Sequence, residues 1–351
     1  MAIVLDGPVL PADLTTFVRE VPQPANFVLN QILPDVYIED NRVDLGIITR
    51  ANRMARFRAY DANLHRAQRQ TATTSIVQLP PLSDTLVMGE LERLQLEFAR
   101  TGGTNTGAFV NAIYNDAEEL TRNVLHRMEF ARGDVLVDGK FTLGSLAGET
   151  GLVIEADFGV PTGNFMVPQI LWSATATADI LSDLNAWVTY YINLNGYAPK
   201  GMWISRQTST QLLSNQLLRT AAGTLLGAAS FLSRAALDAS LAAHMLPPIL
   251  GVYDSMVDVD GVATRILPAN KVIFVPPDGV PFGRTVWGLS ATALEIAGMA
   301  DAGLSFEDAP GIVGAVDKSD APPYRQQTFV DAVGMPVLDN PKALMVATVS
   351  A

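Results

Sequence analysis

The stretch that decides the fold is GAFVNAIYNDAEELTRNVLHRMEFARGDVLV, which runs from Gly107 to Val137. Apolar residues recur in it at steps of three and four, which places one continuous apolar stripe along an α-helix. The stripe consists of Val110, Ile113, Tyr114, Ala117, Leu120, Val124, Leu125, Met128, Ala131 and Val135. At 1.5 Å per residue this helix would be roughly 45 Å long, well beyond the usual length of a globular helix. We therefore predict one long helix, from 107 to 137, that lies across a large apolar surface.

The charges of this stretch support the same helix, because its acids come before its arginines and so complement the helix dipole. The acids are Asp116, Glu118 and Glu119, and the arginines are Arg122, Arg127 and Arg132. Glu118 can also pair with Arg122 one turn later. Gly139 then follows Asp138 and is suited to a left-handed helix stop.

Length and composition describe an ordinary globular protein. A chain of 351 residues that is 48% hydrophobic and 17% charged can form two domains with a substantial core. The net charge of -12 argues against a dedicated nucleic-acid binder, which needs clustered cations, and favours simple solubility. The chain has no cysteine, which excludes disulfides and thiolate chemistry. It has only three histidines, His65, His126 and His244, so few residues are available for histidine-based catalysis or zinc binding. With no signal-like start and no run long enough to span a membrane, we expect a protein that is cytosolic when it is made and does not contact a membrane.

The first half of the chain reads as an arm followed by a long excursion. Residues 1–48 are rich in proline, which breaks regular elements, so we expect an extended arm that lies on another surface. A strand is predicted from Val43 to Arg50. Between Asp44 and Glu90 the chain then resembles a two-stranded excursion, with a turn at Pro80-Pro81, that has no core of its own. A short helix is predicted over Glu90–Arg100.

The excursion carries an island of arginines in an otherwise acidic protein. The island consists of Arg50, Arg53, Arg56, Arg58, Arg66 and Arg69, with Asp61 as its only acid. Such a cluster of positive charges is expected to face a surface of opposite charge. Stacking of nucleic-acid bases on Phe57 and Tyr60 is one alternative, but pairing with the acids of a neighbouring subunit is favoured.

The second half alternates helices and strands, which indicates a compact α/β domain that begins near Trp172. Asp179 can cap a helix that ends at Gly196, and further helices are predicted over Thr208–Arg219 and Ala235–His244. Strands are predicted at 152–160, 200–205, 249–259 and 271–277, the last two joined across Asp260-Gly261, and a strand pair closes the chain at 336–351.

No catalytic or cofactor motif is convincing. The stretch from Gly133 to Lys140 only superficially suggests a phosphate-binding loop, since its glycines are wrongly spaced and a helix precedes it. Asp258 to Gly261 resembles the start of a calcium loop but lacks the downstream glutamate, so a strand-to-strand turn is the better interpretation. The sequence therefore predicts no catalytic residue, no cofactor and no metal, and the tryptophans are expected to pack in the core.

A series of short motifs, in order along the chain, resembles the lambda-type major capsid proteins of tailed bacteriophages, the major capsid protein E family. The motifs are VLVDGKFTL at 135–143, DFG at 157–159, ILPANKV at 266–272, GRTVWG at 283–288 and MPVLDNP at 335–341.

The resemblance implies an α+β protein with the Hong Kong 97-type capsid fold. Residues 1–48 would be the N-terminal arm and 49–92 the extended loop that reaches over a neighbouring subunit. Residues 93–171 and 321–351 would form the peripheral domain with the long helix as its spine, and 172–320 the axial domain. The closing strand would return to the peripheral sheet.

The implied function is self-assembly into pentamers and hexamers of an icosahedral head that encloses double-stranded DNA. Decoration protein, scaffolding protein and portal are the implied partners, with DNA contacted non-specifically at the inner surface of the virion. We expect the six arginines of the island to face acids of an adjacent subunit, namely Glu90, Glu92, Asp116, Glu118 and Glu119. Some shells of this fold form Lys-Asn isopeptide bonds, but every lysine here lies at or beyond Lys140, so we expect no such cross-link at the extended loop. An encapsulin-like nanocompartment shell and an α/β enzyme are the two alternatives.

Overall fold

The computed structural model describes residues 2–3, 9–47, 73–91, 106–143, 155–223, 231–259, 261–298, 305, 309–319, 322 and 325–351. By their internal contacts these fall into two compact units. Unit 1 comprises residues 1–43, 77–132 and 284–337, and unit 2 comprises 44–76, 133–283 and 338–351. The predicted domain bounds stay a prediction. In the contact-based division, residues 284–320 group with residues 106–132 of the long helix, whereas residues 338–351 group with residues 133–283.

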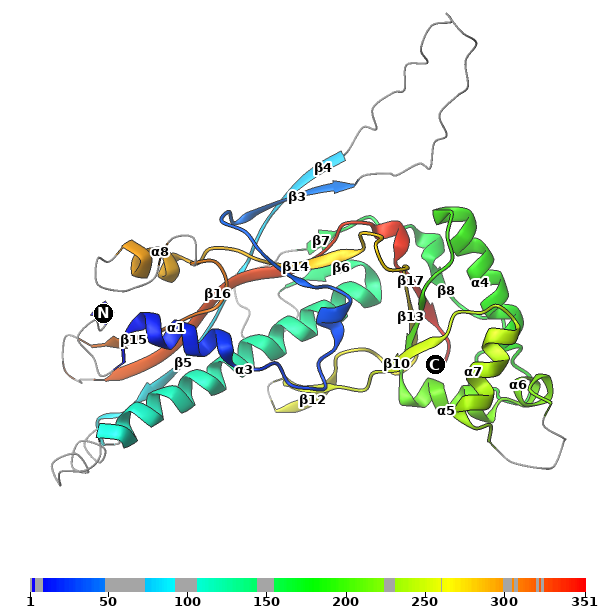
Figure 1. The fold of residues 1–351 in the computed structure, drawn as a ribbon, viewed down its shortest axis with the longest axis horizontal. Coiled ribbons are helices and arrows are strands. Elements are labelled where there is room, and N and C mark those ends of the chain that lie inside the picture. Colours follow the sequence, from blue (N-terminus) through cyan, green and yellow to red (C-terminus); the bar gives the residue numbers. More distant parts are fainter. Residues whose placement is uncertain are drawn as a thin grey trace, which may run out of the picture. The chain divides into compact units, whose positions relative to one another are not determined.

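Unit 1 is built on a six-stranded sheet with the order β1-β15-β16-β14-β2, in which β5 also pairs with β16 (Figure 1). Its strands are β1 (Ala2–Ile3), β2 (Asp35–Tyr37), β5 (Pro81–Met88), β14 (Gly283–Trp287), β15 (Val313–Lys318) and β16 (Gln326–Leu338). The longest strand, β16, is antiparallel to both β15 and β5. It therefore forms the centre of the sheet.

Helices cover both faces of this sheet. Because side chains alternate along a strand, Val330 of β16 points to one face and Phe329 to the other. Val330 packs in a core cluster with helices α1 (Pro11–Glu20) and α3 (Thr106–Asp138), whereas Phe329 packs on a second cluster that contains α8 (Ala291–Gly298). The sheet is thus the middle layer of three.

The long helix was predicted from 107 to 137 and is observed from 106 to 138, which confirms the periodicity argument. Ten positions were assigned to its apolar stripe, and eight of them are fully buried while Val110 and Tyr114 are partly so. The helix ends at Gly139, whose φ of +73° is the left-handed conformation expected there.

Helix α1 contradicts the extended path that was predicted for the arm. Pro11 occupies the first turn, where its missing N–H costs nothing, so it starts the helix instead of breaking it. Leu14 and Val18, one turn apart, are buried against the sheet, and α1 packs on β15. The rest of the arm includes the short 3-10 turn η1 (Leu29–Gln31) and β2.

The base of the predicted excursion is a two-stranded sheet of β3 (Arg42–Ile47) and β4 (Thr73–Gln78). The chain then passes through Leu79-Pro80 into β5, so the break between the two strands lies one residue before the turn predicted at Pro80-Pro81. Residues 48–72, most of the predicted helix 90–100 and residues 152–154 of a predicted strand lie outside the described residues.

Unit 2 contains a five-stranded sheet with the order β10-β9-β13-β17-β8. The strands are β8 (Phe165–Met166), β9 (Gly201–Ile204), β10 (Ile249–Val252), β13 (Lys271–Val275) and β17 (Met345–Thr348). The closing strand β17 therefore pairs with β13 and β8, and does not return to the sheet that packs on the long helix as was expected.

Four helices pack on this sheet through one apolar cluster, namely α4 (Ile180–Asn195), α5 (Arg206–Ser214), α6 (Gln216–Ala221) and α7 (Arg234–Ala243). Asp179 caps α4 by accepting a hydrogen bond from the backbone N–H of Ser182, and Gly196 ends it at a φ of +81°, both as predicted. The single helix predicted over 208–219 is instead two, because Asn215 ends α5 and its side chain caps α6.

Unit 2 also contains two antiparallel strand pairs, β6 (Lys140–Thr142) with β7 (Glu155–Asp157) and β11 (Met256–Val259) with β12 (Val262–Arg265). Its described residues include the 3-10 turns η2 (Thr162–Asn164) and η3 (Pro341–Ala343) as well. The strand predicted over 249–259 is divided into β10 and β11. The turn that includes Gly261 joins β11 to β12, and not to β13 as was predicted.

Candidate assembly surfaces

The acidic side of α3 was predicted to face a neighbouring subunit. Its three acids lie on one helix as expected, with Glu119 exposed and Asp116 and Glu118 half-buried. Glu118 accepts a hydrogen bond from Arg122 within the helix, so the predicted pair is confirmed and this carboxylate is already engaged. Glu90 is exposed beyond β5. Glu92 and the arginines of the island lie outside the described residues, so their pairing stays a prediction.

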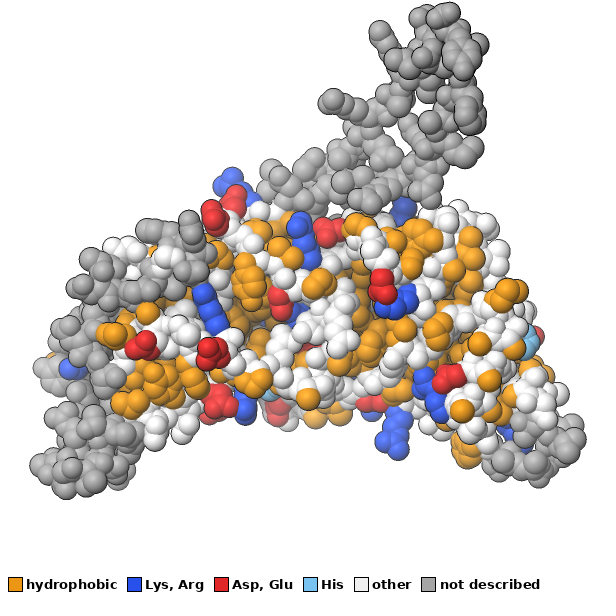
Figure 2. Space-filling view, in the orientation of Figure 1, with side chains coloured by type: hydrophobic (Ala, Val, Ile, Leu, Met, Phe, Trp, Pro, Cys, Tyr) orange, Lys and Arg blue, Asp and Glu red, His pale blue; other side chains and the backbone are white. Residues whose placement is uncertain are grey.

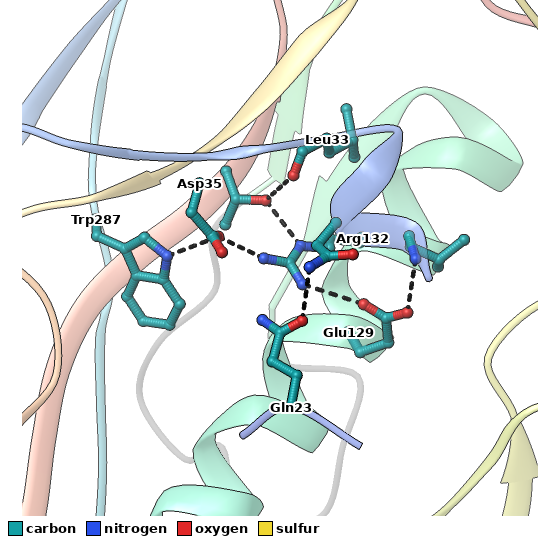
Figure 3. A network of polar contacts seen from close by, with 9 residues as sticks. Gln23, Leu33, Asp35, Glu129, Arg132 and Trp287 are labelled. Atoms are coloured by element: carbon teal, nitrogen blue, oxygen red, sulfur yellow. Dashed lines mark hydrogen bonds and ion pairs between the residues drawn. The ribbon is translucent and has the colours of Figure 1, made fainter. Parts of the chain in front are cut away.

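Sequence reasoning missed a buried network of charges on the same helix, further toward its C-terminal end (Figure 3). Glu129 and Arg132 are fully buried, and Arg132 Nη1 lies 3.1 Å from Glu129 Oε2. The other two guanidinium nitrogens donate to Asp35 Oδ1 and, at 2.8 Å, to Thr285 Oγ1. The guanidinium thus joins α3 to both β2 and β14.

The network also holds the backbone of the arm. Glu129 Oε1 accepts a hydrogen bond of 3.0 Å from the N–H of Leu29, and Thr285 Oγ1 donates to the carbonyl of Leu33 at 2.9 Å. Trp287 Nε1 donates to Asp35 at 2.8 Å. We call this set of residues, Leu29, Leu33, Asp35, Glu129, Arg132, Thr285 and Trp287, the arm clamp.

The sequence contains only a weak indication of the arm clamp. Glu129 and Arg132 stand three residues apart, and each directly follows a residue of the apolar stripe, Met128 or Ala131. That position puts a charged pair at the margin of the buried face, which is unusual enough to suggest a buried ion pair.

His126 lies on the same helix, edge-on to Phe27 with 5.1 Å between the ring centroids. Burial, followed by the nearby Arg122 guanidinium, lowers the pKa of His126 below its ordinary value. The histidine is therefore favoured in its neutral form where it packs on the arm.

The sequence motifs that do not qualify as phosphate-binding or calcium-binding sites have structural roles. Gly133 lies inside α3, where a Cβ would come within 2.6 Å of Ile266. The end of the stretch that superficially suggested a phosphate-binding loop is the helix stop and the turn into β6. Asp258 Oδ1 accepts a hydrogen bond from the N–H of Gly261 in the β11–β12 turn. Trp172, Trp187 and Trp287 are buried, while Trp203 is only partly so.

The described residues contain no group of His, Cys, Asp or Glu side chains that could hold a metal ion. Within that same part of the chain, no helix is both long and apolar enough to cross a membrane. Among the described residues on the face drawn in Figure 2, acidic and basic side chains are dispersed among apolar and uncharged surface, without a basic patch.

The sequence matches the family described as phage major capsid protein E over residues 11–309. The chain belongs to this family. It is a structural subunit of a phage capsid, part of the virion, and not an enzyme. The match favours the phage capsid over the encapsulin-like shell, the alternative with the same fold.

Solved structures agree with the family. A candidate prophage capsid protein from Escherichia coli CFT073 superposes with a TM-score of 0.61 at 12% identity, covering 97% of this chain and 99% of that chain. A phage-related protein from Bordetella bronchiseptica RB50 superposes with a TM-score of 0.54 at 10% identity, covering 97% of each chain. No curated protein matches the sequence. The fold of this capsid protein is therefore the Hong Kong 97-type fold, as the sequence predicted.

Proposed function

We propose that this capsid protein assembles as pentamers and hexamers into the icosahedral head of a tailed bacteriophage, which encloses double-stranded DNA. The observation that carries the proposal is the family match over residues 11–309, with the capsid fold beneath it. A closed shell repeats each subunit contact by symmetry, so contacts that are weak singly become strong together.

The parts of the chain would share this work as follows. Residues 49–92 form the extended loop that reaches a neighbouring subunit, which the pairing of β3 with β4 at its base supports. The arm (1–48) and the long helix with its six-stranded sheet serve as the peripheral part. The five-stranded sheet and its helices serve as the axial part, for which we adjust the boundaries to 165–283 and 338–351 because β8 and β17 belong to that sheet.

The arginine island of the loop supplies a contact between subunits in this proposal. Arg50, Arg53, Arg56, Arg58, Arg66 and Arg69 would face acids of the adjacent copy, with Glu90, Glu92, Asp116, Glu118 and Glu119 as candidates. An exposed acid such as Glu119 is accessible for such a contact. Opposite charges across an interface guide association.

The remaining partners follow from the shell. Decoration protein would bind the outside of the shell, scaffolding protein would guide assembly in the host cytoplasm, and the portal would replace one pentamer. Packaged DNA would touch the inner surface without sequence specificity. With a net charge of -12, the subunit has no excess of cations that would bind DNA tightly.

Electron microscopy of the expressed chain, alone and with its scaffolding protein, tests the proposal. We expect icosahedral shells, tubes or hexamers, and only monomers under both conditions would contradict it. The double charge reversal Arg56→Glu with Arg58→Glu should weaken or abolish assembly. Reversal of Arg265 alone, which pairs with Asp254 inside the subunit, serves as the control and should not.

A further inference from the structure

The segment Pro161–Leu171 of unit 2 combines an absence of charge with an exposed apolar surface. No charged residue and no histidine occurs between Asp157 and Asp179. Such a run ordinarily belongs to a core, yet Phe165, Val167 and Ile170 expose 37%, 66% and 44% of their surface in the single subunit. We call these three side chains the apolar patch.

The beginning of the segment is fixed by a buried amide. Asn164 is buried, and its Nδ2 donates hydrogen bonds to the carbonyls of Lys342 at 3.0 Å and Leu344 at 2.6 Å. Directly after it, β8 pairs with β17 (Figure 1). Gly163 lies so close to α4 that a Cβ there would come within 2.4 Å of Tyr190 Oη.

The end of the segment is fixed by a buried tryptophan. Trp172 is fully buried, and its backbone N–H donates to the carbonyl of Val349 at 2.8 Å. Its ring stacks on Trp187 with 5.7 Å between centroids, and Nε1 donates to Asp183 at 3.0 Å. The segment is pinned at both ends and includes η2 and β8, so binding against the patch should cost little ordering entropy.

We propose that the apolar patch packs against a second copy of this chain in the shell. This inference rests on the proposed self-assembly and names a surface that it uses. Each copy carries a net charge of -12, so copies repel one another, and they can approach at least cost where the surface carries no charge. A partner attracted by charge would be basic and would select an acidic surface instead.

The composition of the patch fits the same occupant. The centres of protein interfaces are depleted in charged residues, and interfaces between identical subunits are more apolar than the remaining surface. Three large apolar side chains within six residues, on a rigid support, have that character.

A matched pair of variants tests the inference. Val167 and Val262 expose 66% and 65% of their surface, but only Val167 belongs to the patch. Val167→Asp should abolish shell formation in electron microscopy, whereas Val262→Asp should assemble like the unaltered chain, and both should unfold at the same urea concentration as the unaltered subunit. Shells of Val167→Asp in unaltered yield would overturn the inference.

A labelling experiment keeps the test decisive if the aspartate variant does not fold. The chain has no cysteine, so Val167→Cys introduces its sole thiol. We expect a maleimide to label this thiol in dissociated subunits and to lose that labelling in bare shells. Equal labelling in both, or protection that appears only after decoration protein is added, would overturn the contact between copies. Failure of the unaltered chain to form any particle would instead contradict the proposed function.

Discussion

Two segments of this capsid protein are held in place by opposite means. The arm between Leu29 and Asp35 is fixed by the buried charges of the arm clamp, whereas the segment from Pro161 to Leu171 is fixed by a neutral amide and a stacked indole. Buried charges have lost their hydration and depend on one another, while neutral hydrogen bonds can be lost one at a time. Loss of one charged group should therefore release the arm as a whole, whereas loss of one neutral hydrogen bond should weaken the attachment of the segment only in part.

The largest expected effect comes from breaking the arm clamp. Arg132→Met leaves Glu129 and Asp35 without their shared cation, and Glu129 is fully buried. We expect the free energy of unfolding, measured with urea on the subunit, to fall by about 3–5 kcal/mol.

The matched control is Arg122→Met on the exposed side of the same helix, which should cost less than about 1 kcal/mol. Adding Glu129→Gln to Arg132→Met should recover part of the loss, because the buried carboxylate charge is then gone while the amide oxygen can still accept from the N–H of Leu29. Equal losses for the two arginine variants would show that the buried clamp stabilises the subunit no more than an exposed ion pair does.

A smaller loss is expected from the neutral anchor. Asn164→Ala removes the amide that donates to the carbonyls of Lys342 and Leu344, but the Lys342 carbonyl keeps Asn195 as a donor. The free energy of unfolding should fall by about 1–3 kcal/mol. Asn185→Ala, on the exposed side of α4, is the control and should change it little. A loss as large as that of Arg132→Met would show that neutral anchoring is no more graded than the clamp.

The sequence predicted what depends on local periodicity and stop signals. The long helix was predicted to within one residue at each end, because a single stripe and one glycine define it. Helix α1 was missed because its proline was counted as a breaker without regard to its position in the first turn. Local signals are reliable only when position within the element is considered.

The site was harder to predict than the fold, because its parts are distant in sequence. Asp35, Arg132 and Thr285 meet only after three separate elements have packed. The sheet that β17 joins likewise depends on pairing with a strand that is distant in the sequence. The apolar patch lacks a sequence signature for another reason, since an uncharged run is ordinarily core and only exposure in the folded subunit distinguishes it.

A pH titration can sharpen the description of how the arm is held. Burial, followed by Arg122, lowers the pKa of His126 from its ordinary value of 6.5. Below that pH the unfolded chain binds more protons than the folded one, so the stability should fall as the pH is lowered from 6.5 toward the folded-state pKa. His126→Phe keeps the ring contact with Phe27 and should lose this dependence. Parallel stability curves for the two proteins between pH 7 and pH 5 would contradict the assignment.

The smallest effect is expected at the exposed pair on α3, which isolates burial as the variable. Glu118 and Arg122 are four residues apart on the helix that also carries the arm clamp, but both side chains are substantially exposed. Glu118→Gln should lower the free energy of unfolding by only about 0.3–0.5 kcal/mol at low salt. That difference should disappear in high salt, because exposed charges are screened, whereas the loss in Arg132→Met should persist. Glu119→Gln, the neighbouring exposed acid, is the control. A salt-independent loss at Glu118 would mean that exposure does not separate the two ion pairs, and the clamp would then owe its strength to geometry instead of burial.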